Sequence, residues 1–292
     1  MAPSDANSPP DVTVAVLTLN GGAALTRFVE AVQTQATERS VEILAVDSGS
    51  TDGMPDALAA KGVRVVPLDV RPFDFGLARD AAFEQARGRI VVSLSQDAVP
   101  AHERWLDNLV APLDEPGVGA SCGRSIPDPE RGTAQFPWEA NGYFYFTREI
   151  QRFVKQYGRG LSNANSAIPR EVWAKLRFGA QPIGEDFRFQ IKLCEAGLRI
   201  AFPSDAEVLH HHDYTFGALV KRCRNEGLGL RDMGVPYPEC DLLADLISPR
   251  KYIVWARDLL RGRLRTAAAL AFPIVRPMAV YAGARFGRRL IP

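Results

Sequence analysis

Three aspartates stand where side chains of this type could do chemistry. Asp47 and Asp97 each follow an apolar run of strand length, and Asp186 opens a segment with helical spacing. A carboxylate at the end of a strand can accept hydrogen bonds from a nucleoside or supply oxygen ligands to Mg²⁺ or Mn²⁺. A carboxylate at a helix start is kept ionised by the helix dipole and can act as a general base. Taken singly, Asp47 and Asp97 are also compatible with helix caps, and Asp186 with the acidic first turn of any helix.

The elements that must position these aspartates are those of an open α/β sheet. In the first third of the chain, apolar runs of strand length alternate with helix-length segments, which predicts a mostly parallel sheet with crossover helices. We expect strands at 12–19, 41–46, 63–67 and 89–94, and helices at 23–34, 54–61 and 75–87. Ligands of such sheets bind at the carboxyl ends of the strands. Asp47 and Asp97 are therefore expected at one edge of the sheet.

Two polar turns follow the first two predicted strands. The first turn carries Thr18 and Asn20, and the second is Asp47-Ser48-Gly49-Ser50-Thr51-Asp52-Gly53. Together they resemble the opening of family 2 glycosyltransferases of the GT-A fold, whose strands end in Thr-x-Asn and Asp-x-Gly-Ser-Thr-Asp-Gly. The resemblance implies a Rossmann-like α/β fold, with a mixed, mostly parallel sheet flanked by helices, and a nucleotide-sugar donor. The donor-binding residues that it implies here are Thr18, Asn20, Asp47, Ser50 and Asp52, although Asp52 alone favours a helix cap.

Two further motifs extend the resemblance. The run FDFGLARD, residues 73–80, is similar to the family's Gly-x-Ala-Arg-Asn helix start beside the donor, with Asp80 in place of Asn. Ser95-Gln96-Asp97 stands where the family has Asp-x-Asp, which implies that Asp97 holds Mn²⁺ or Mg²⁺ at the donor diphosphate. Arg79, Asp80 and Gln96 are accordingly expected at the donor. The form Gln-Asp-Ala resembles rhamnosyltransferase-like members and favours dTDP-rhamnose.

Three consecutive histidines follow a predicted strand at 207–209. The family often completes its metal site with a histidine from this half of the chain. Strand alternation would put His210 and His212 on one face and His211 on the other. We therefore expect His210 and His212 as candidate metal ligands beside Asp97.

The general base is expected at the start of a helix over 185–196. Gly184-Glu185-Asp186 resembles the Glu-Asp motif with which the family begins an acceptor-side helix. The resemblance implies inverting transfer, in which Asp186, with Glu185 beside it, takes the proton of the acceptor hydroxyl. Acidic residues are also favoured in the first turn of any helix, so the pair alone decides nothing.

The acceptor is expected to be a saccharide or a lipid-linked saccharide. Asn163 and Asn165 lie in a small polar segment that resembles the one beside the family's acceptor site, or they form a simple turn. Trp138 and the aromatic residues at 143–145, in a long loop over 127–148, could stack on a sugar. Aromatic clusters of this kind more often belong to a core.

Composition limits the classes of partner. The 292 residues carry Lys+Arg 35 and Asp+Glu 34, and this net charge of +1 gives no global reason to expect nucleic acid binding. The four cysteines are scattered without a CxxC pair, which argues against a zinc knuckle or a disulfide scaffold and fits a reducing cytosol. Residues 1–10 have neither a basic nor an apolar run, so we expect a flexible leader and not a secretory signal.

The domain organisation follows from a change in composition. We expect one glycosyltransferase domain at 11–247, with a donor half at 11–100 and an acceptor half at 101–247, and a basic amphipathic helical tail at 248–292. The apolar run 267–275 is too short to span a bilayer, so a transmembrane helix is not expected. The arginines of the tail suit peripheral docking on the cytoplasmic face of a membrane, while a helix packed on the main domain is the simpler interpretation. The oligomeric state is left open.

Three other classes of protein share parts of this pattern. A nicotinamide dehydrogenase would need GxGxxG after the first strand, where this chain has NGGAAL. A sugar nucleotidyltransferase should show a Gly-rich loop with Lys or Arg at that position, and Asn20-Gly21-Gly22 has no lysine nearby. A non-catalytic domain that binds a nucleotide sugar or serves as a scaffold stays open, because the first carboxylate of Asp-x-Asp is missing.

Overall fold

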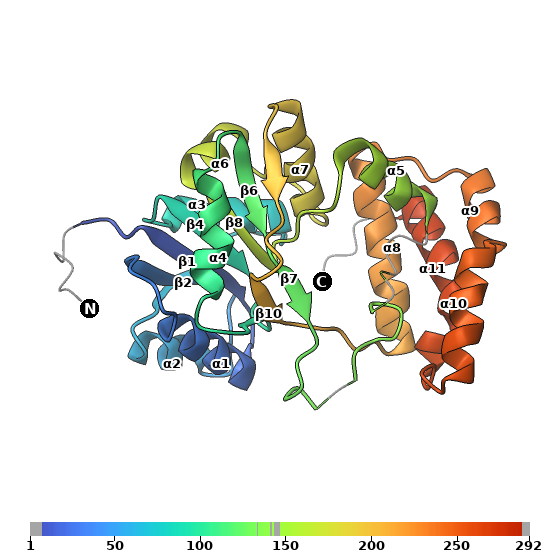
Figure 1. Ribbon diagram of the computed structural model, residues 1–292, viewed down its shortest axis with the longest axis horizontal. Coiled ribbons are helices and arrows are strands. Elements are labelled where there is room, and N and C mark those ends of the chain that lie inside the picture. Colours follow the sequence, from blue (N-terminus) through green and yellow to red (C-terminus); the bar gives the residue numbers. More distant parts are fainter. Residues whose placement is uncertain (1–7, 133, 141, 143–146, 288–292) are drawn as a thin grey trace. The chain divides into compact units, whose positions relative to one another are not determined.

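The structure is a computed structural model that describes residues 8–132, 134–140, 142 and 147–287 (Figure 1). The described residues divide into two compact units. The first comprises those of Met1–Pro127, Gly160–Gln181 and Glu185–His210, and the second those of Asp128–Arg159, Pro182–Gly184 and His211–Pro292.

Within the described part of the chain, seven strands form the main sheet of the first unit, in the order β3-β2-β1-β4-β8-β6-β9. Their bounds are β1 Val12–Thr18, β2 Val41–Asp47, β3 Arg64–Pro67, β4 Ile90–Leu94, β6 Val118–Cys122, β8 Asn165–Pro169 and β9 Arg199–Ala201. β1 to β4 are parallel, β8 is antiparallel to β4 and β6, and β9 is parallel to β6. The predicted mixed and mostly parallel sheet is therefore confirmed.

A second, small sheet has the order β5-β10-β7. Its strands are β5 Val99–Pro100, β7 Arg124–Ile126 and β10 Glu207–Leu209, and β10 coincides with the predicted strand. Because β5 follows Asp97 closely and β10 directly precedes His210, their antiparallel pairing brings these two residues to one place.

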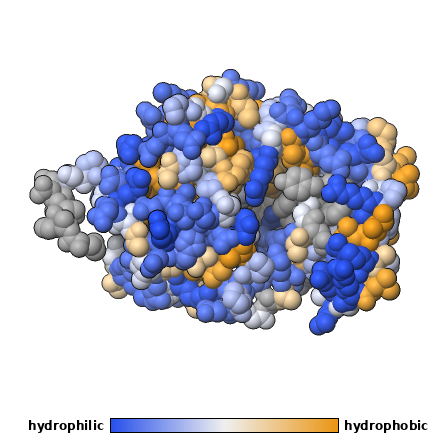
Figure 2. Space-filling view, in the orientation of Figure 1, coloured by the Kyte–Doolittle hydropathy of each residue, from blue (hydrophilic) through white to orange (hydrophobic). Residues whose placement is uncertain are grey.

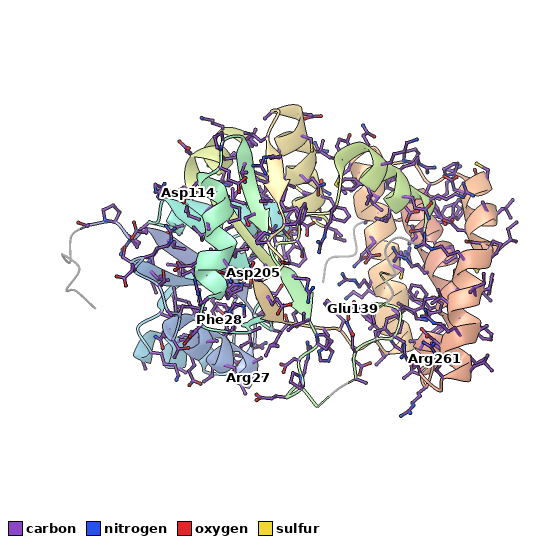
Figure 3. All side chains as sticks on the ribbon, in the orientation of Figure 1. Arg27, Phe28, Asp114, Glu139, Asp205 and Arg261 are labelled. Atoms are coloured by element: carbon purple, nitrogen blue, oxygen red, sulfur yellow. The ribbon has the colours of Figure 1, made fainter. Side chains whose placement is uncertain are left out.

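Helices cover both faces of the main sheet. They are α1 Gly22–Gln33, α2 Met54–Ala60, α3 Phe75–Gln85, α4 Trp105–Val110 with the 3₁₀ turn η1 Ala111–Asp114, α6 Arg170–Leu176 and α7 Glu185–Glu195. Val14 of β1 packs in one core with Phe28 of α1, which Figure 3 labels, and with Trp105 of α4. Ala15, the next residue of β1, packs in a second core with Phe83 of α3. Alternate side chains of a strand point to opposite faces, so a strand buried on both faces reads as one continuous apolar run.

The carboxyl ends of β1, β2 and β4 lie at one edge of this sheet because the three strands are parallel. β8 runs the other way, so its first residue, Asn165, pairs with Leu94 at the end of β4. The segment before β8 is thereby brought to the same edge as Asp47 and Asp97.

The second unit is helical. Its helices are α5 Arg148–Tyr157, α8 Phe216–Asp232, α9 Glu239–Leu246, α10 Pro249–Leu260 and α11 Ala267–Phe286. α8 and α11 pack almost backbone to backbone, because a Cβ added at Gly227 would lie 2.0 Å from the Val280 carbonyl oxygen. A buried ion pair joins the same helices, with Arg276 Nη1 2.6 Å from Glu226 Oε2.

These helices bear on two expectations about the carboxyl-terminal part. α8 and α9 pack with α10 and α11, and the second compact unit includes residues 211–247 as well as the predicted tail, so the boundary at 247 stays a prediction from composition. The predicted apolar run 267–275 is only the first half of α11. The whole helix has 20 residues and includes Pro273 and Pro277. By length and composition this helix could cross a membrane, and half of its most apolar window is buried in the protein. Of the predicted leader, residues 1–7 lie outside the described chain.

Candidate active site

The Asp47 carboxylate organises the turn that follows β2. It accepts hydrogen bonds from the Ser50 hydroxyl at 2.5 Å, from the N–H groups of Ser50 and Gly49 at 2.8 and 3.0 Å, and from the Thr18 hydroxyl at 3.0 Å. Burial alone would raise the pKa of Asp47, but these hydrogen bonds outweigh it and lower the pKa. Asp47 is therefore an ionised acceptor at neutral pH.

The turns after β1 and β2 are bonded to each other. Asn20 has a φ of 49°, its N–H donates to the Ser50 hydroxyl at 2.8 Å, and its Oδ1 accepts from the Thr51 N–H at 2.9 Å. Asp52 accepts from the N–H groups of Gly22 and Met54, both at 3.1 Å, and so links the starts of α1 and α2. The five residues of these turns that are predicted to bind the nucleotide sugar thus form one polar cluster at the edge of the sheet. Within it, Asp52 has the expected capping contact.

Gln96 and Asp97 follow β4 at the same edge. The Gln96 amide is paired with the backbone of Leu19, accepting from its N–H at 3.0 Å and donating to its carbonyl at 3.3 Å. Asp97 Oδ1 lies 3.4 Å from Nε2 of His210, whose residue is 8% exposed. His210, one of the two predicted histidine ligands, thus lies beside Asp97.

The strand alternation expected for the three histidines does not extend to them, because β10 ends at Leu209. The assignment of His212 as a metal ligand stays a prediction. His211 and His212 belong to the second unit. His211 Nδ1 accepts from the Asp128 N–H at 3.0 Å. His212 Nδ1 lies 2.8 Å from an oxygen of Glu139, which Figure 3 labels. In the described chain no group of three or more His, Cys, Asp or Glu side chains is arranged to hold a metal.

A buried ionic cluster surrounds the start of α7. Glu185 Oε1 accepts from the Asn163 amide at 3.0 Å and lies 3.7 Å from Arg79 Nε. Arg79 is 6% exposed, and its Nε and Nη1 have no hydrogen-bond partner within the described residues. Burial and the neighbouring Glu185 carboxylate raise the pKa of Asp186 to about 7, against the opposing charge of Arg79. The cluster therefore sets a carboxyl group that titrates near neutral pH beside a buried cation.

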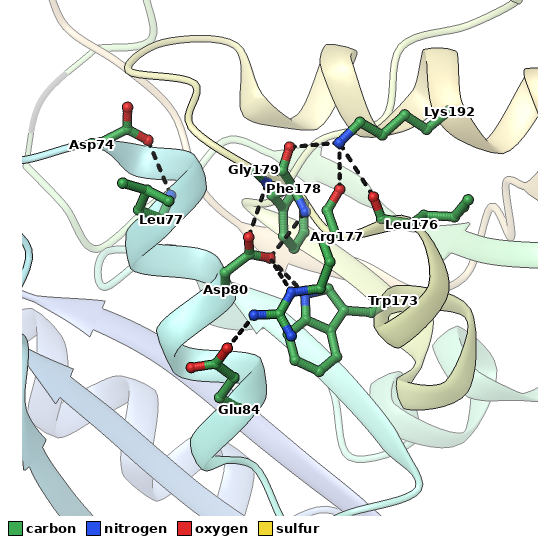
Figure 4. Close-up of polar contacts among 10 residues, drawn as sticks. All are labelled: Asp74, Leu77, Asp80, Glu84, Trp173, Leu176, Arg177, Phe178, Gly179 and Lys192. Carbon is green, nitrogen blue, oxygen red and sulfur yellow. Dashed lines mark hydrogen bonds and ion pairs between the residues drawn. The ribbon is translucent and has the colours of Figure 1, made fainter.

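Asp80 holds the loop that leads to α7 (Figure 4). Its carboxylate accepts from Trp173 Nε1 at 2.7 Å and from the N–H groups of Phe178 and Gly179, each at 2.9 Å. Asp80 is 7% exposed, so its oxygens are used within the protein. The prediction that Asp80 binds the donor is therefore corrected, because this carboxylate is a structural acceptor.

Two residues that sequence reasoning missed act on the same loop. Asp74 caps α3 at the Leu77 N–H and also accepts from the Gln181 N–H, at 3.0 and 2.9 Å. Lys192 of α7 donates to the carbonyl oxygens of three residues at the end of α6, which are Leu176, Arg177 and Phe178 (Figure 4). An aspartate directly before a helical segment is a signal for a cap, but nothing in the sequence indicates the partners of Lys192.

We expect Asp80→Ala to lower the free energy of unfolding by about 3 kcal/mol, because it strands three buried donors that now bond a carboxylate. Urea titration followed by fluorescence measures this change. Glu84→Ala, one turn further along α3, removes only an exposed pair with Arg177 and should change the free energy by less than about 0.5 kcal/mol. Equal stability of the two variants would contradict the assigned role of Asp80.

Two predicted acceptor residues are placed inside cores. Asn165 is 1% exposed, accepts from Trp105 Nε1 at 3.0 Å and donates to the Ala206 carbonyl at 2.9 Å. Trp138 is 1% exposed, stacks on Phe272 and donates to the Ala269 carbonyl at 2.8 Å. Both expectations are corrected, because neither side chain has a polar atom or an aromatic face left for a sugar. The predicted aromatic residues at 143–145 lie outside the described residues.

The fold and the polar edge define a class of protein. The family model for glycosyl transferase family 2 matches residues 13–177, and the chain belongs to this family. It is a glycosyltransferase, as the motifs of β1 and β2 predicted.

Individual relatives are similar over most of the chain. The O-antigen chain rhamnosyltransferase RfbN of Salmonella typhimurium is 27% identical over 214 residues, which are 70% of this chain and 67% of that protein. The O-antigen chain rhamnosyltransferase WbaN of Salmonella anatum is 27% identical over 218 residues, covering 70% and 68%. These similarities support the predicted rhamnosyltransferase-like character.

Solved structures share the fold. A mannosyltransferase from Pyrobaculum calidifontis, in complex with GDP-mannose and Mn²⁺, has a TM-score of 0.64 at 20% identity and covers 96% of this chain and 88% of its own. Glucosyl-3-phosphoglycerate synthase from Mycobacterium tuberculosis, in complex with Mn²⁺, UDP-glucose and phosphoglyceric acid, has a TM-score of 0.59 at 23% identity, covering 78% and 81%. The predicted GT-A fold is thereby confirmed.

Proposed function

We propose that this protein is an inverting, metal-dependent glycosyltransferase that moves rhamnose from dTDP-rhamnose to a hydroxyl of a saccharide or lipid-linked saccharide. The observation that carries the proposal is the contrast between two carboxyl groups whose pKa values are shifted in opposite directions. Asp47 has a lowered pKa in the donor turn, and Asp186 has a pKa of about 7 beside a buried arginine. One carboxylate stays ionised to accept hydrogen bonds, and the other exchanges a proton near neutral pH.

The donor set is compatible with a divalent cation. Asp97 supplies a hard oxygen and His210 an imidazole nitrogen, with Oδ1 of Asp97 and Nε2 of His210 3.4 Å apart. Mn²⁺ accepts both kinds of ligand. Asp97 and His210 are the residues proposed to hold the ion. When bound, a divalent cation would neutralise charge on the donor diphosphate. The Mn²⁺ in the structures of the mannosyltransferase and the glucosyl synthase supports a metal, although those proteins share only the fold.

In the proposed reaction the acceptor oxygen forms a bond to the anomeric carbon while the bond from that carbon to the diphosphate oxygen breaks. Asp186 takes the hydroxyl proton, and the nucleoside diphosphate leaves with the electron pair of the broken bond. Glu185 keeps the pKa of Asp186 raised, while Arg79, held by Glu185, limits that rise. Asn163 anchors Glu185 and so fixes the start of α7. We assign binding of the nucleotide to the turns that carry Thr18, Asn20, Asp47, Ser50 and Asp52. To Gln96 we assign the role of holding the loop after β4 in position.

The choice of sugar rests on the relatives. Two proteins that resemble most of this chain are O-antigen chain rhamnosyltransferases, and the Gln-Asp-Ala form of the third motif points the same way. The acceptor class, a growing saccharide, is proposed on the same basis.

A thermal-shift panel tests the donor assignment. We expect dTDP and dTDP-rhamnose, with Mn²⁺, to raise the melting temperature more than UDP or GDP, because a ligand that binds only the folded state stabilises it. Asp97→Ala should lose the Mn²⁺-dependent part of the shift. Asp114→Ala, which removes an exposed aspartate in η1, serves as the matched control and should keep it. If no nucleotide stabilises the wild type with Mn²⁺, the donor site is refuted, whereas a preference for another nucleotide changes only the sugar.

A further inference from the structure

One face of α11 carries a row of exposed apolar side chains. Leu270, Ile274 and Met278 are 41%, 51% and 54% exposed and stand four residues apart. Residues with this spacing lie on one side of a helix. The opposite side is buried against α8, where Arg276 pairs with Glu226. The exposed row is therefore not required for packing within the helical unit.

α9 and α10 present similar side chains. Ile253 and Leu260 of α10, seven residues apart, are 68% and 89% exposed, and Leu243 of α9 and Ile247, directly after it, are 62% and 76% exposed. The Trp255 indole of α10 donates to the Leu270 carbonyl of α11 at 2.9 Å, so these two helices meet beside the apolar row. Tryptophan with a bonded N–H and an apolar body is typical of membrane interfaces.

The chain after α9 is strongly positive. Residues 248–292 contain ten Lys and Arg and a single acidic residue, Asp258, although the whole chain is nearly neutral. Arg261, Arg263 and Arg265 are exposed in the turn between α10 and α11, directly after Leu260. Figure 2 shows dark blue hydrophilic residues next to orange hydrophobic ones over these helices, and Figure 3 labels Arg261. Apolar side chains beside arginines form a surface that can enter the headgroup layer of an anionic bilayer.

We propose that the exposed face of α9, α10 and α11 docks the enzyme on the surface of an anionic lipid bilayer. The apolar row would sit among the acyl chains at the headgroup boundary, and the arginines would contact lipid phosphates. A second copy of this chain fits the face less well, because the arginines of the two copies would repel each other. Binding at the interface requires only the exposed side of α11, whereas crossing the bilayer would expose its ion-paired side, with Arg276, to lipid.

Vesicle flotation tests this docking surface without donor, acceptor or turnover, so its failure is separate from failure of the proposed transfer. We expect the wild type to float with vesicles of phosphatidylcholine and phosphatidylglycerol and to stay in solution with phosphatidylcholine alone. Arg261→Glu with Arg263→Glu should weaken binding by at least about 25-fold, since each arginine near the surface contributes about fivefold. Ile274→Asp with Met278→Asp should weaken it as well, because the apolar contact is lost.

The control for charge is Arg87→Glu with Arg89→Glu, which makes the same charge change at two exposed positions of the first unit. It should bind vesicles as the wild type does, and circular dichroism checks that all variants are folded. The proposal is overturned if the wild type does not bind anionic vesicles, or if the substitutions in α10 and α11 leave binding unchanged. A concentration-dependent dimer that Ile274→Asp with Met278→Asp dissociates would also overturn it, by assigning the face to a second copy.

Discussion

Asp186→Asn is expected to lower kcat by about 10²–10⁴-fold, the usual contribution of a general base, while the donor still binds. The substitution keeps the size of the side chain and removes its ability to take a proton. Initial rates of nucleoside diphosphate release measure kcat, and calorimetry measures donor affinity. Glu171→Gln, which neutralises an exposed acid in the first turn of α6, is the matched control and should retain full activity. A turnover of Asp186→Asn within threefold of the wild type would remove Asp186 as the base.

The same variant has a predictable effect on stability. The pKa of Asp186 is raised from 3.8 to about 7 in the folded protein, so ionisation of this group opposes folding. Its contribution to stability is present below about pH 4 and is lost as the pH rises to about 7. At pH 8 Asp186→Asn should therefore be at least as resistant to urea as the wild type. An inactive variant that is clearly less stable at pH 8 would indicate a structural role.

Glu185→Gln is expected to have the second largest effect, because the Glu185 side chain acts on both Arg79 and Asp186. It leaves Arg79 buried without its nearest carboxylate, and breaking a buried ion pair in this way costs about 3–5 kcal/mol of stability. It also removes the negative charge that helps to raise the pKa of Asp186. The acidic limb of the profile of kcat/KM against pH should accordingly move to lower pH.

The pH profile separates this prediction from a general loss of structure. In the wild type, kcat/KM should fall as the pH drops through about 7, since protonated Asp186 cannot accept a proton. In Glu185→Gln the midpoint should lie lower, whatever the remaining rate. An unchanged midpoint would show that Glu185 does not control the titration of the base. Glu171→Gln again supplies the comparison, because it changes charge at a helix start outside the cluster.

The elements of the donor half were predictable from local patterns. The strands and helices expected between residues 12 and 94 agree with β1 to β4 and α1 to α3 to within one or two residues. Parallel strands buried on both faces produce continuous apolar runs, and polar turns interrupt them where the strands end. The same logic put Asp47 and Asp97 at one edge, because parallel strands share the direction of their carboxyl ends.

The long-range partners of polar side chains were not predictable in this way. Asp80 matched a donor motif, yet its oxygens are taken by Trp173, Phe178 and Gly179, which are more than ninety residues away in the chain. Asn165 and Trp138 looked suited to a sugar, and both are enclosed in cores with their polar atoms bonded. The type of each side chain is known from the sequence, but its exposure to solvent depends on which segments pack around it.

The sequence by itself therefore determined the family, the α/β sheet and the positions of Asp47, Asp97 and Asp186 at the ends of their elements, because periodicity and turn residues are local properties. Only the tertiary structure decided that His210 stands beside Asp97, that Arg79 and Glu185 share a buried pair, and that α11 leaves one apolar face exposed. These features arise only when distant segments of the chain pack together, because that packing desolvates charged side chains and brings their partners within reach.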